Sequence, residues 1–265
     1  MRRSFRKFLR WSTWKHCIYL PAIVRLVENW WPFLKLYVGF NEQSRRFQLR
    51  NGLVINLNQA VESENIATTF IKKEYGDVPD GSVVIDIGAS IGDFALLAAG
   101  QGKRTRVIAV EPMPATVALL EQNIRQNNFS GQITVIAGAV AGITGTQMLH
   151  TSDSALSHTL VAGVHRGSSG VPIQCFSLAD VMEQHQISQC DILKMDCEGA
   201  EYDILYNTAP ETLKKIKELR FEYHTLPNAS THPIHQLVSY LQKAGFTVTQ
   251  GSTEARNAVL WMRQS

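Results

Sequence analysis

The residues best suited to chemistry lie where an apolar segment ends in a glycine turn. Residues 83–87 form an apolar run that is typical of a buried parallel strand, and Gly88 and Gly92 follow it. Glycine lets the backbone turn tightly and approach a ligand without a Cβ atom in the way. The carboxylate of Asp86 would repel a pyrophosphate at this turn but would attract a cationic group. The turn therefore predicts a nucleotide-like ligand that carries a positive charge.

A second acid ends the next apolar run. Residues 107–110 lead directly into Glu111, and an acid at this strand end hydrogen-bonds the ribose hydroxyls of nucleotide ligands in doubly wound folds. An adenosyl ligand with a positively charged amino-acid end satisfies both Asp86 and Glu111. The sequence thus predicts S-adenosylmethionine as the cofactor.

A third group of polar residues follows the apolar run 191–195. Asp196 and Glu198 lie two residues apart there, and such carboxylates orient a hydroxyl, accept its proton or coordinate a divalent cation. We expect Lys194 to pair with one of them and to keep it ionised. His224 closes the next strand and is the favoured general base, because neutral imidazole accepts a proton near neutral pH. Asp196 is the alternative base. A divalent cation held by Asp196 and Glu198 would lower the pKa of the hydroxyl instead, but the sequence gives no support for a metal site and none is predicted.

These residues require a sheet whose strands end along one edge. From residue 83 onwards strand-like runs alternate with segments of helical periodicity, which is the pattern of a doubly wound parallel sheet. Ligands bind beyond the carboxyl ends of such strands, so Ala139, after the third strand, is expected to join the cofactor site. The predicted strands span residues 83–87, 106–111, 132–137, 191–195, 218–223, 246–249 and 258–262, and the predicted helices span residues 92–100, 114–127, 178–185, 200–207 and 234–244.

Three other regions complete the predicted organisation. Residues 141–171, rich in glycine, serine and threonine, are expected to form a loop with short edge strands. An Asn-Gly pair between two alternating apolar runs predicts a β-hairpin over residues 47–57. Residues 63–75 have helical spacing, with Gly76 as the expected stop.

The composition limits the classes of protein to which this chain can belong. The 265 residues are 45% hydrophobic and 18% charged, and the net charge of +3 comes largely from basic residues among the first ten. This composition is typical of a folded globular chain, and the near-neutral remainder argues against a nucleic-acid partner. Four cysteines without C-x-x-C spacing favour a reducing compartment, and charges and prolines interrupt the apolar segment 17–40. We therefore expect a cytoplasmic protein.

The N-terminal segment is distinct from the rest. Residues 1–44 are predicted to form a basic, aromatic-rich helical extension, and residues 45–265 a Rossmann-like domain that includes the hairpin and a cap, with its core over 80–265. An amphipathic helix that covers this domain is the favoured interpretation of the extension. Its basic and tryptophan-rich character leaves peripheral membrane contact through residues 1–40 as the alternative.

Three motifs together resemble those of the FkbM family of S-adenosylmethionine-dependent methyltransferases. They are V-I-D-I-G-A-S-I-G at residues 84–92, V-E-P at 110–112 and D-I-L-K-M-D-C-E-G-A-E at 191–201. The first two occur in most class I methyltransferases, whereas the third is characteristic of FkbM-like proteins. Cys197 stands where valine or isoleucine is commoner. The resemblance covers roughly residues 45 to 250.

The resemblance implies an α/β fold of the class I methyltransferase type, with a seven-stranded, mostly parallel Rossmann-like sheet, helices on both faces and a final antiparallel strand. Glu111 would bind the ribose, and Asp196 and Glu198 would face the acceptor. The methionine end of the cofactor would be lined by Asp86, Gly88, Ala89, Ser90 and Gly92.

The expected reaction is O-methylation of a small-molecule or glycan hydroxyl, on a sugar or a secondary metabolite, by in-line displacement at the cofactor's methyl group. Two alternatives stay open. One is an RNA or protein methyltransferase, and the other is a non-catalytic adenosyl-binding scaffold associated with a membrane. The sequence leaves the acceptor, a divalent cation and the oligomeric state undetermined.

Overall fold

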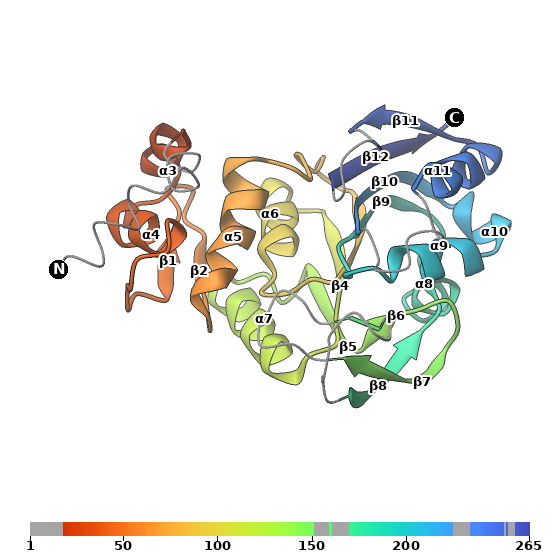
Figure 1. The fold of residues 1–265 in the computed structure, drawn as a ribbon, viewed down its shortest axis with the longest axis horizontal. Helices are drawn as coiled ribbons and strands as arrows, with labels where there is room; N and C mark the ends of the chain where they lie inside the picture. The colour runs from red at the N-terminus through yellow and green to blue at the C-terminus, as the bar shows by residue number, and fades with distance from the viewer. Residues whose placement is uncertain (1–17, 151–158, 161–169, 225–233, 252, 254–257) are drawn as a thin grey trace.

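The computed structural model describes residues 18–150, 159–160, 170–224, 234–251, 253 and 258–265 (Figure 1). In this part of the chain, seven strands form a central sheet in the order β11-β12-β10-β9-β3-β4-β5. In this sheet β12 alone runs opposite to the other six strands, as the predicted class I methyltransferase sheet requires. The strands are β3 (Val83–Ile87), β4 (Arg106–Glu111), β5 (Ile133–Ala137), β9 (Cys190–Met195), β10 (Ile216–Tyr223), β11 (Phe246–Gln250) and β12 (Ala258–Gln264).

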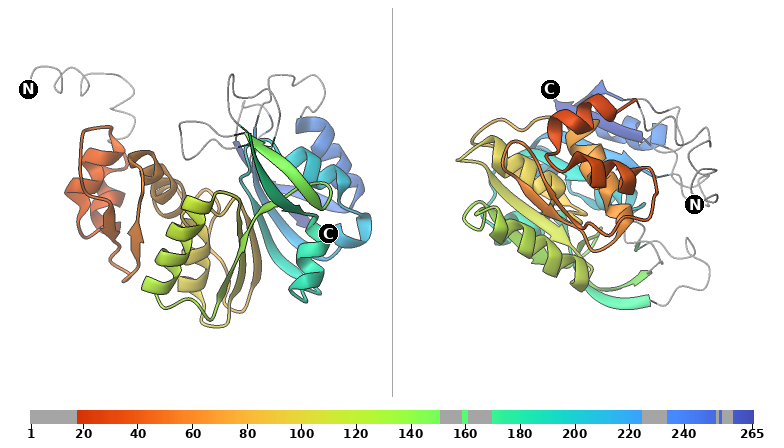
Figure 2. Two further views of the ribbon diagram at one scale, coloured as in Figure 1. Left: turned by 90° about the horizontal axis from the view of Figure 1, so that it is seen from below. Right: turned by 90° about the vertical axis from the view of Figure 1, so that its left-hand side faces the viewer.

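Helices cover both faces of this sheet (Figures 1 and 2). Successive residues of a strand point to opposite faces, so Val84 packs in the cluster that contains α6 and α7, and Ile85 packs in the cluster that contains α8, α9 and α11. Burial on both faces explains why the central strands are continuously apolar. The helices are α6 (Asp93–Gln101), α7 (Pro114–Gln126), α8 (Leu178–Gln184), α9 (Glu201–Asn207), α10 (Pro210–Leu213) and α11 (Ile234–Lys243). The short α10 was not predicted.

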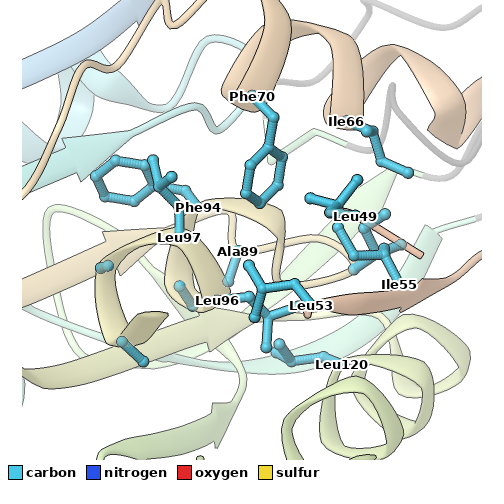
Figure 3. Close-up of a cluster of buried hydrophobic side chains, with 14 of the residues drawn as sticks. Leu49, Leu53, Ile55, Ile66, Phe70, Ala89, Phe94, Leu96, Leu97 and Leu120 are labelled. Atoms are coloured by element: carbon cyan, nitrogen blue, oxygen red, sulfur yellow. The ribbon is translucent and has the colours of Figure 1, made fainter. Parts of the chain in front are cut away.

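The N-terminal elements share the core of the sheet. The helices α3 (Leu20–Leu26) and α4 (Trp30–Tyr37) and the hairpin strands β1 (Arg46–Gln48) and β2 (Val54–Asn56) precede η1 (Ala60–Glu62), α5 (Ser63–Ile66) and the π-helical turn η2 (Ala67–Ile71). Figure 3 shows hairpin residues Leu49, Leu53 and Ile55 in one cluster with Leu96 of α6 and Leu120 of α7. The predicted hairpin is confirmed. This shared core holds α5 and η2 against the central sheet.

Several sequence expectations are modified here. The predicted helix over residues 63–75 ends at Ile71, because Lys73 takes a left-handed φ of 53°. The insertion forms a separate sheet of β6 (Ala139–Val140), β7 (Gly145–His150) and β8 (Gly170–Phe176), in the order β6-β8-β7. Parts of the predicted extension and of the predicted insertion lie outside the described residues, namely residues 1–17, 151–158 and 161–169. Among the described helices, no apolar stretch has the length of a membrane span.

Candidate active site

The glycine turn after β3 brings three strand ends together. Gly88 has a φ of 71°, and a Cβ atom there would lie 1.9 Å from the carbonyl oxygen of Asp196. Only glycine therefore lets the turn lie this close to the end of β9. The backbone nitrogens of Gly88 and Ala89 both donate to the carbonyl oxygen of Val110 at 3.0 Å. The turn is thus tied to the ends of β4 and β9 at once.

A cavity of about 430 Å³ opens at these strand ends, within the range of about 300–1,000 Å³ that is usual for small-ligand pockets. Its wall includes seven of the ten predicted site residues, namely Gly88, Ser90, Glu111, Ala139, Asp196, Glu198 and His224. One side is formed by Glu64, Asn65 and Thr68 of α5 and η2, and another by Leu149 and Leu160 of the insertion. The cavity therefore joins the predicted cofactor residues to the predicted acceptor residues.

Three predicted residues are not part of the cavity wall: Asp86, Ala89 and Gly92. Asp86 is fully buried, and its Oδ1 lies 3.0 Å from Nζ of Lys194. The same Lys194 donates to the carbonyl oxygen of Gly88 at 2.9 Å. The expected contact of Asp86 with the cofactor's cationic group, and the expected pairing of Lys194 with Asp196 or Glu198, are thus replaced by a buried ion pair beneath the turn.

The register of the sheet explains this pair. Asp86 of β3 and Lys194 of β9 are direct partners across the two parallel strands. Burial raises the pKa of Asp86, and the charge of Lys194 opposes that rise. Burial lowers the pKa of Lys194, but the surrounding carboxylates raise it by more. The ammonium group therefore stays charged and fixes the turn to β9.

Glu111 is arranged to accept hydroxyl donors. Its Oε2 accepts the backbone N–H of Ser90 and its Oε1 accepts that of Met113, each at 3.0 Å. Since a carboxylate oxygen has two lone pairs, each oxygen keeps one for the two hydroxyls of a ribose. Burial raises the pKa of Glu111 to about 7. The cavity and this carboxylate together fit an adenosyl ligand.

The segment formed by α5 and η2, which we call the cap, contributes residues that the sequence did not indicate. Nδ2 of Asn65 donates to Oγ of Ser90 at 2.9 Å, and the hydroxyl of Thr69 donates to the carboxylate of Asp93. Asp93 lines the cavity, and burial raises its pKa to about 6. Asp93 is the first residue of α6, directly after the glycine turn, and this position is the one feature of the sequence that could have indicated a place in the site. These contacts join the cap to the cofactor end.

At the acceptor end, four carboxylates surround one imidazole. Nδ1 of His224 lies 3.1 Å from Oε1 of Glu201. Its Nε2 lies 3.7 Å from Oε2 of Glu198, 3.8 Å from Oε1 of Glu222 and 4.0 Å from Oδ1 of Asp196. Glu201, in the first turn of α9, is fully buried and also accepts the backbone N–H of Cys197 at 3.0 Å. Glu201 therefore orients His224.

These carboxylates change the expected role of His224. Burial lowers its pKa, but the hydrogen bond to Glu201 and the charges of the neighbouring acids raise it to about 10. The protonated imidazole has no lone pair to accept a proton, so this arrangement does not favour His224 as the general base. Burial, together with nearby acids, raises the pKa of Glu198 and of Glu222 to about 7. A carboxylate is the better-placed proton acceptor.

Tyr75 fixes the orientation of Asp196. Its hydroxyl donates to Oδ2 of Asp196 at 3.1 Å, and its backbone oxygen accepts from Nη1 of Arg220 at 2.6 Å. The backbone N–H of Asp196 also donates to the carbonyl oxygen of Ile87 at 3.0 Å. Tyr75 lines the cavity from the segment between η2 and β3; it is the last residue of the predicted helix over residues 63–75, and nothing in the sequence marked it as a site residue. It leaves Oδ1 of Asp196 as the oxygen without a hydrogen bond from the tyrosine.

Comparison with known proteins identifies the family. The model of the methyltransferase FkbM domain matches residues 86–248, which is more than half of the chain. Methyltransferase 1 of Beauveria bassiana is 26% identical over 186 residues, covering 60% of this chain and 74% of that protein. The 31-O-demethyl-FK506 methyltransferase FkbM of Streptomyces tacrolimicus is 24% identical over 200 residues, covering 63% of this chain and 74% of that protein.

Another relative is much longer. The AMB antimetabolite synthetase AmbE of Pseudomonas aeruginosa is 25% identical over 239 residues, which cover 75% of this chain but only 11% of that protein. Among solved structures, the methyltransferase FkbM from Methylobacillus flagellatus KT has 14% identity and a TM-score of 0.45, covering 77% of this chain and 54% of that chain. On the evidence of the family model, the chain belongs to the FkbM family of methyltransferases.

Proposed function

We propose that the protein transfers the methyl group of S-adenosylmethionine to a hydroxyl oxygen of a small molecule, sugar or glycan. The observation that carries this proposal is the single cavity in which Gly88 and Glu111 share the wall with Asp196 and Glu198. One end offers a ribose-binding carboxylate, and the other offers carboxylates for a proton that leaves the acceptor. Membership in a methyltransferase family supports the cofactor, and the similarity to the 31-O-demethyl-FK506 methyltransferase of Streptomyces tacrolimicus supports an oxygen acceptor.

The residues at the cofactor end act by binding and orientation. Glu111 would accept the two ribose hydroxyls with the lone pairs that Ser90 and Met113 leave free. The buried pair of Asp86 and Lys194 holds the glycine turn in place beneath them. When bound, S-adenosylmethionine supplies a methyl group that its sulfonium already activates, so the protein's main contribution is to position the two reactants.

At the acceptor end the chain must take up one proton. Bound S-adenosylmethionine would supply the methyl group, and its sulfur would keep the electron pair of the broken bond, so the acceptor hydroxyl would have to release one proton. The hydroxyl proton passes to Oδ1 of Asp196, because Oδ2 is occupied by the hydroxyl of Tyr75. His224, held by Glu201, would keep its positive charge beside the carboxylates during this step.

The test has two stages. Calorimetric titration of S-adenosylmethionine into the purified protein should show binding that Glu111→Gln weakens and Asp196→Asn leaves intact. Mass spectrometry should then find S-adenosylhomocysteine and a methylated product when the protein is supplied with a panel of sugar and secondary-metabolite hydroxyls. Asp196→Asn should lose this turnover, whereas Glu211→Gln, the same kind of change on the exposed start of α10, should not.

Three results would overturn the proposal. A folded protein that binds no S-adenosylmethionine would remove the cofactor assignment. Methylation of RNA or protein, without methylation of any small hydroxyl compound, would move the acceptor to another class. Cofactor binding without transfer to any acceptor would favour a scaffold role.

A further inference from the structure

We propose that Asp196, Glu198 and His224 form a binding site for one divalent cation at the acceptor end of the cavity. One ligand atom from each of these side chains lies within 4.8 Å of the other two, and all three side chains line the cavity. They come from the ends of two adjacent parallel strands, β9 and β10. The binding of a cation stands on this geometry alone, whereas its part in the reaction rests on the proposed function.

The orientation of His224 is the first observation in favour of a cation. Nδ1 is engaged by Glu201, whose fully buried carboxylate is itself held by the backbone N–H of Cys197. This leaves Nε2 directed at the group of carboxylates. Histidines that ligate metals usually bind a carboxylate with the other ring nitrogen in this way, which fixes both the tautomer and the ring. The ring is thus held as a metal-ligating histidine would be, and a bound cation would replace the proton that Nε2 carries in its absence.

The distances around Nε2 are the second observation. Among the described residues, its nearest carboxylate oxygens lie 3.7, 3.8 and 4.0 Å away, and none of them is hydrogen-bonded to it. Charge-assisted hydrogen bonds would bring such atoms to about 2.7–2.9 Å. A cation with bonds of about 2.0–2.2 Å holds ligand atoms about 3 to 4 Å apart, depending on the angle between them. The observed spacing matches ligands that surround an ion better than partners that share a proton.

The local charge is the third observation. Four carboxylates, those of Asp196, Glu198, Glu201 and Glu222, lie around a single imidazole. The nearby ammonium of Lys194 is already committed to Asp86 at 3.0 Å. Glu201 is fully buried and the other three carboxylates are partly shielded from water, so their negative charges disfavour one another unless a cation offsets them. A divalent ion would supply that positive charge without any rearrangement of the strands.

The donor set indicates the kind of ion. Carboxylate oxygens suit Mg²⁺, Ca²⁺ and Mn²⁺, whereas imidazole nitrogen suits the transition metals. Mn²⁺ accepts both kinds of ligand, and this site offers both. Three protein ligands do not complete the coordination shell of the ion. The remaining positions could bind an acceptor oxygen, as in catalytic metal sites.

An ion here would change how the acceptor loses its proton. A hydroxyl bound to the cation has a lower pKa, so it would reach the nucleophilic form without a strong base. Asp196 would then hold the ion, and the proton would pass to Glu222, which lines the same cavity. Acceptors with two neighbouring oxygens, such as vicinal diols, would bind best because both oxygens could reach one ion.

The test uses Mn²⁺ and the full-length protein. Electron paramagnetic resonance measures free Mn²⁺, so its signal should fall as protein is added, with saturation at one ion per chain. Asp196→Asn and Glu198→Gln should each weaken binding by about tenfold or more, and Glu201→Gln should weaken it by a smaller factor because it only orients His224. Glu211→Gln, on the exposed α10, should bind Mn²⁺ as the wild type does. Circular dichroism melting curves of the variants would verify that they are folded.

Failure of this inference can be distinguished from failure of the proposed function. A free Mn²⁺ signal that millimolar protein does not reduce, or equal binding by wild type and Asp196→Asn, would overturn the cation site. If S-adenosylmethionine binds normally in that case, the cofactor assignment still stands. Methyl transfer that is unaffected by a chelator, in a protein shown to bind Mn²⁺, would overturn the ion's role in the reaction.

Discussion

The affinity for S-adenosylmethionine should depend on pH through Glu111. Burial raises the pKa of this carboxyl to about 7, so it is mostly protonated below that pH and mostly ionised above it. Only the ionised form offers a charged acceptor to both ribose hydroxyls. Binding should therefore weaken as the pH falls through 7 and strengthen as it rises.

The magnitude follows from the pKa. With a value of about 7, roughly one tenth of the Glu111 carboxyls are ionised at pH 6 and roughly nine tenths at pH 8. If the cofactor binds only to the ionised form, the Kd at pH 6 should be about tenfold higher than at pH 8, equivalent to about 1.4 kcal/mol. Glu111→Gln should lose binding at pH 8, where charged hydrogen bonds contribute about 1.5–3 kcal/mol each, and should lose much less at pH 6.

The assay is calorimetric titration of S-adenosylmethionine at pH 6, 7 and 8 into wild type and Glu111→Gln. The cofactor's own amino and carboxyl groups titrate equally in both experiments, so the difference between the two proteins isolates Glu111. A wild-type Kd that changes with pH no more than that of the variant would refute the reasoning. It would mean either that the carboxyl is not the ribose ligand or that its pKa lies outside this range.

Three further predictions follow from the packing around the site. Gly88→Ala should lower the melting temperature and abolish cofactor binding, because its Cβ would lie 1.9 Å from a backbone oxygen; unchanged melting would contradict this close contact. Lys194→Met should destabilise the fold by about 3–5 kcal/mol in urea unfolding, since Asp86 would be left buried without its partner, and adding Asp86→Asn should recover part of that loss. Tyr75→Phe should lower kcat through misorientation of Asp196 while the calorimetric affinity for S-adenosylmethionine stays the same; equal losses in both would indicate a general structural role.

The sequence predicted the central sheet well because the strands at its centre, such as β3 and β4, are largely apolar on both faces. Each predicted strand from residue 83 onwards appears, with ends that differ by a few residues, and the Asn-Gly hairpin is present. The sequence pattern that predicts each of these elements lies within the element itself. The short α10 has too few residues to show a helical period.

The errors at the site have one common cause. The partner of Asp86 depends on the register between β3 and β9, which are separated by more than one hundred residues along the chain. Likewise, the protonation state of His224 depends on acids from four other positions, and the role of Glu201 depends on where α9 places it relative to the end of β10. Residue type and position at a strand end located these groups, but only the tertiary structure determines which charge faces which.

Some residues of the cavity wall lie within the region that matches the family model, and others lie before it. The match to the FkbM model begins at residue 86, whereas Glu64, Asn65, Thr68 and Tyr75 contribute to the same cavity from before that point. Two proteins that share the matched region could thus differ in the shape and charge presented to an acceptor by this preceding segment. Under the proposed function, changes near Tyr75 would alter which acceptor fits beside Asp196, while Glu111 and the glycine turn, within the matched region, would bind the same cofactor.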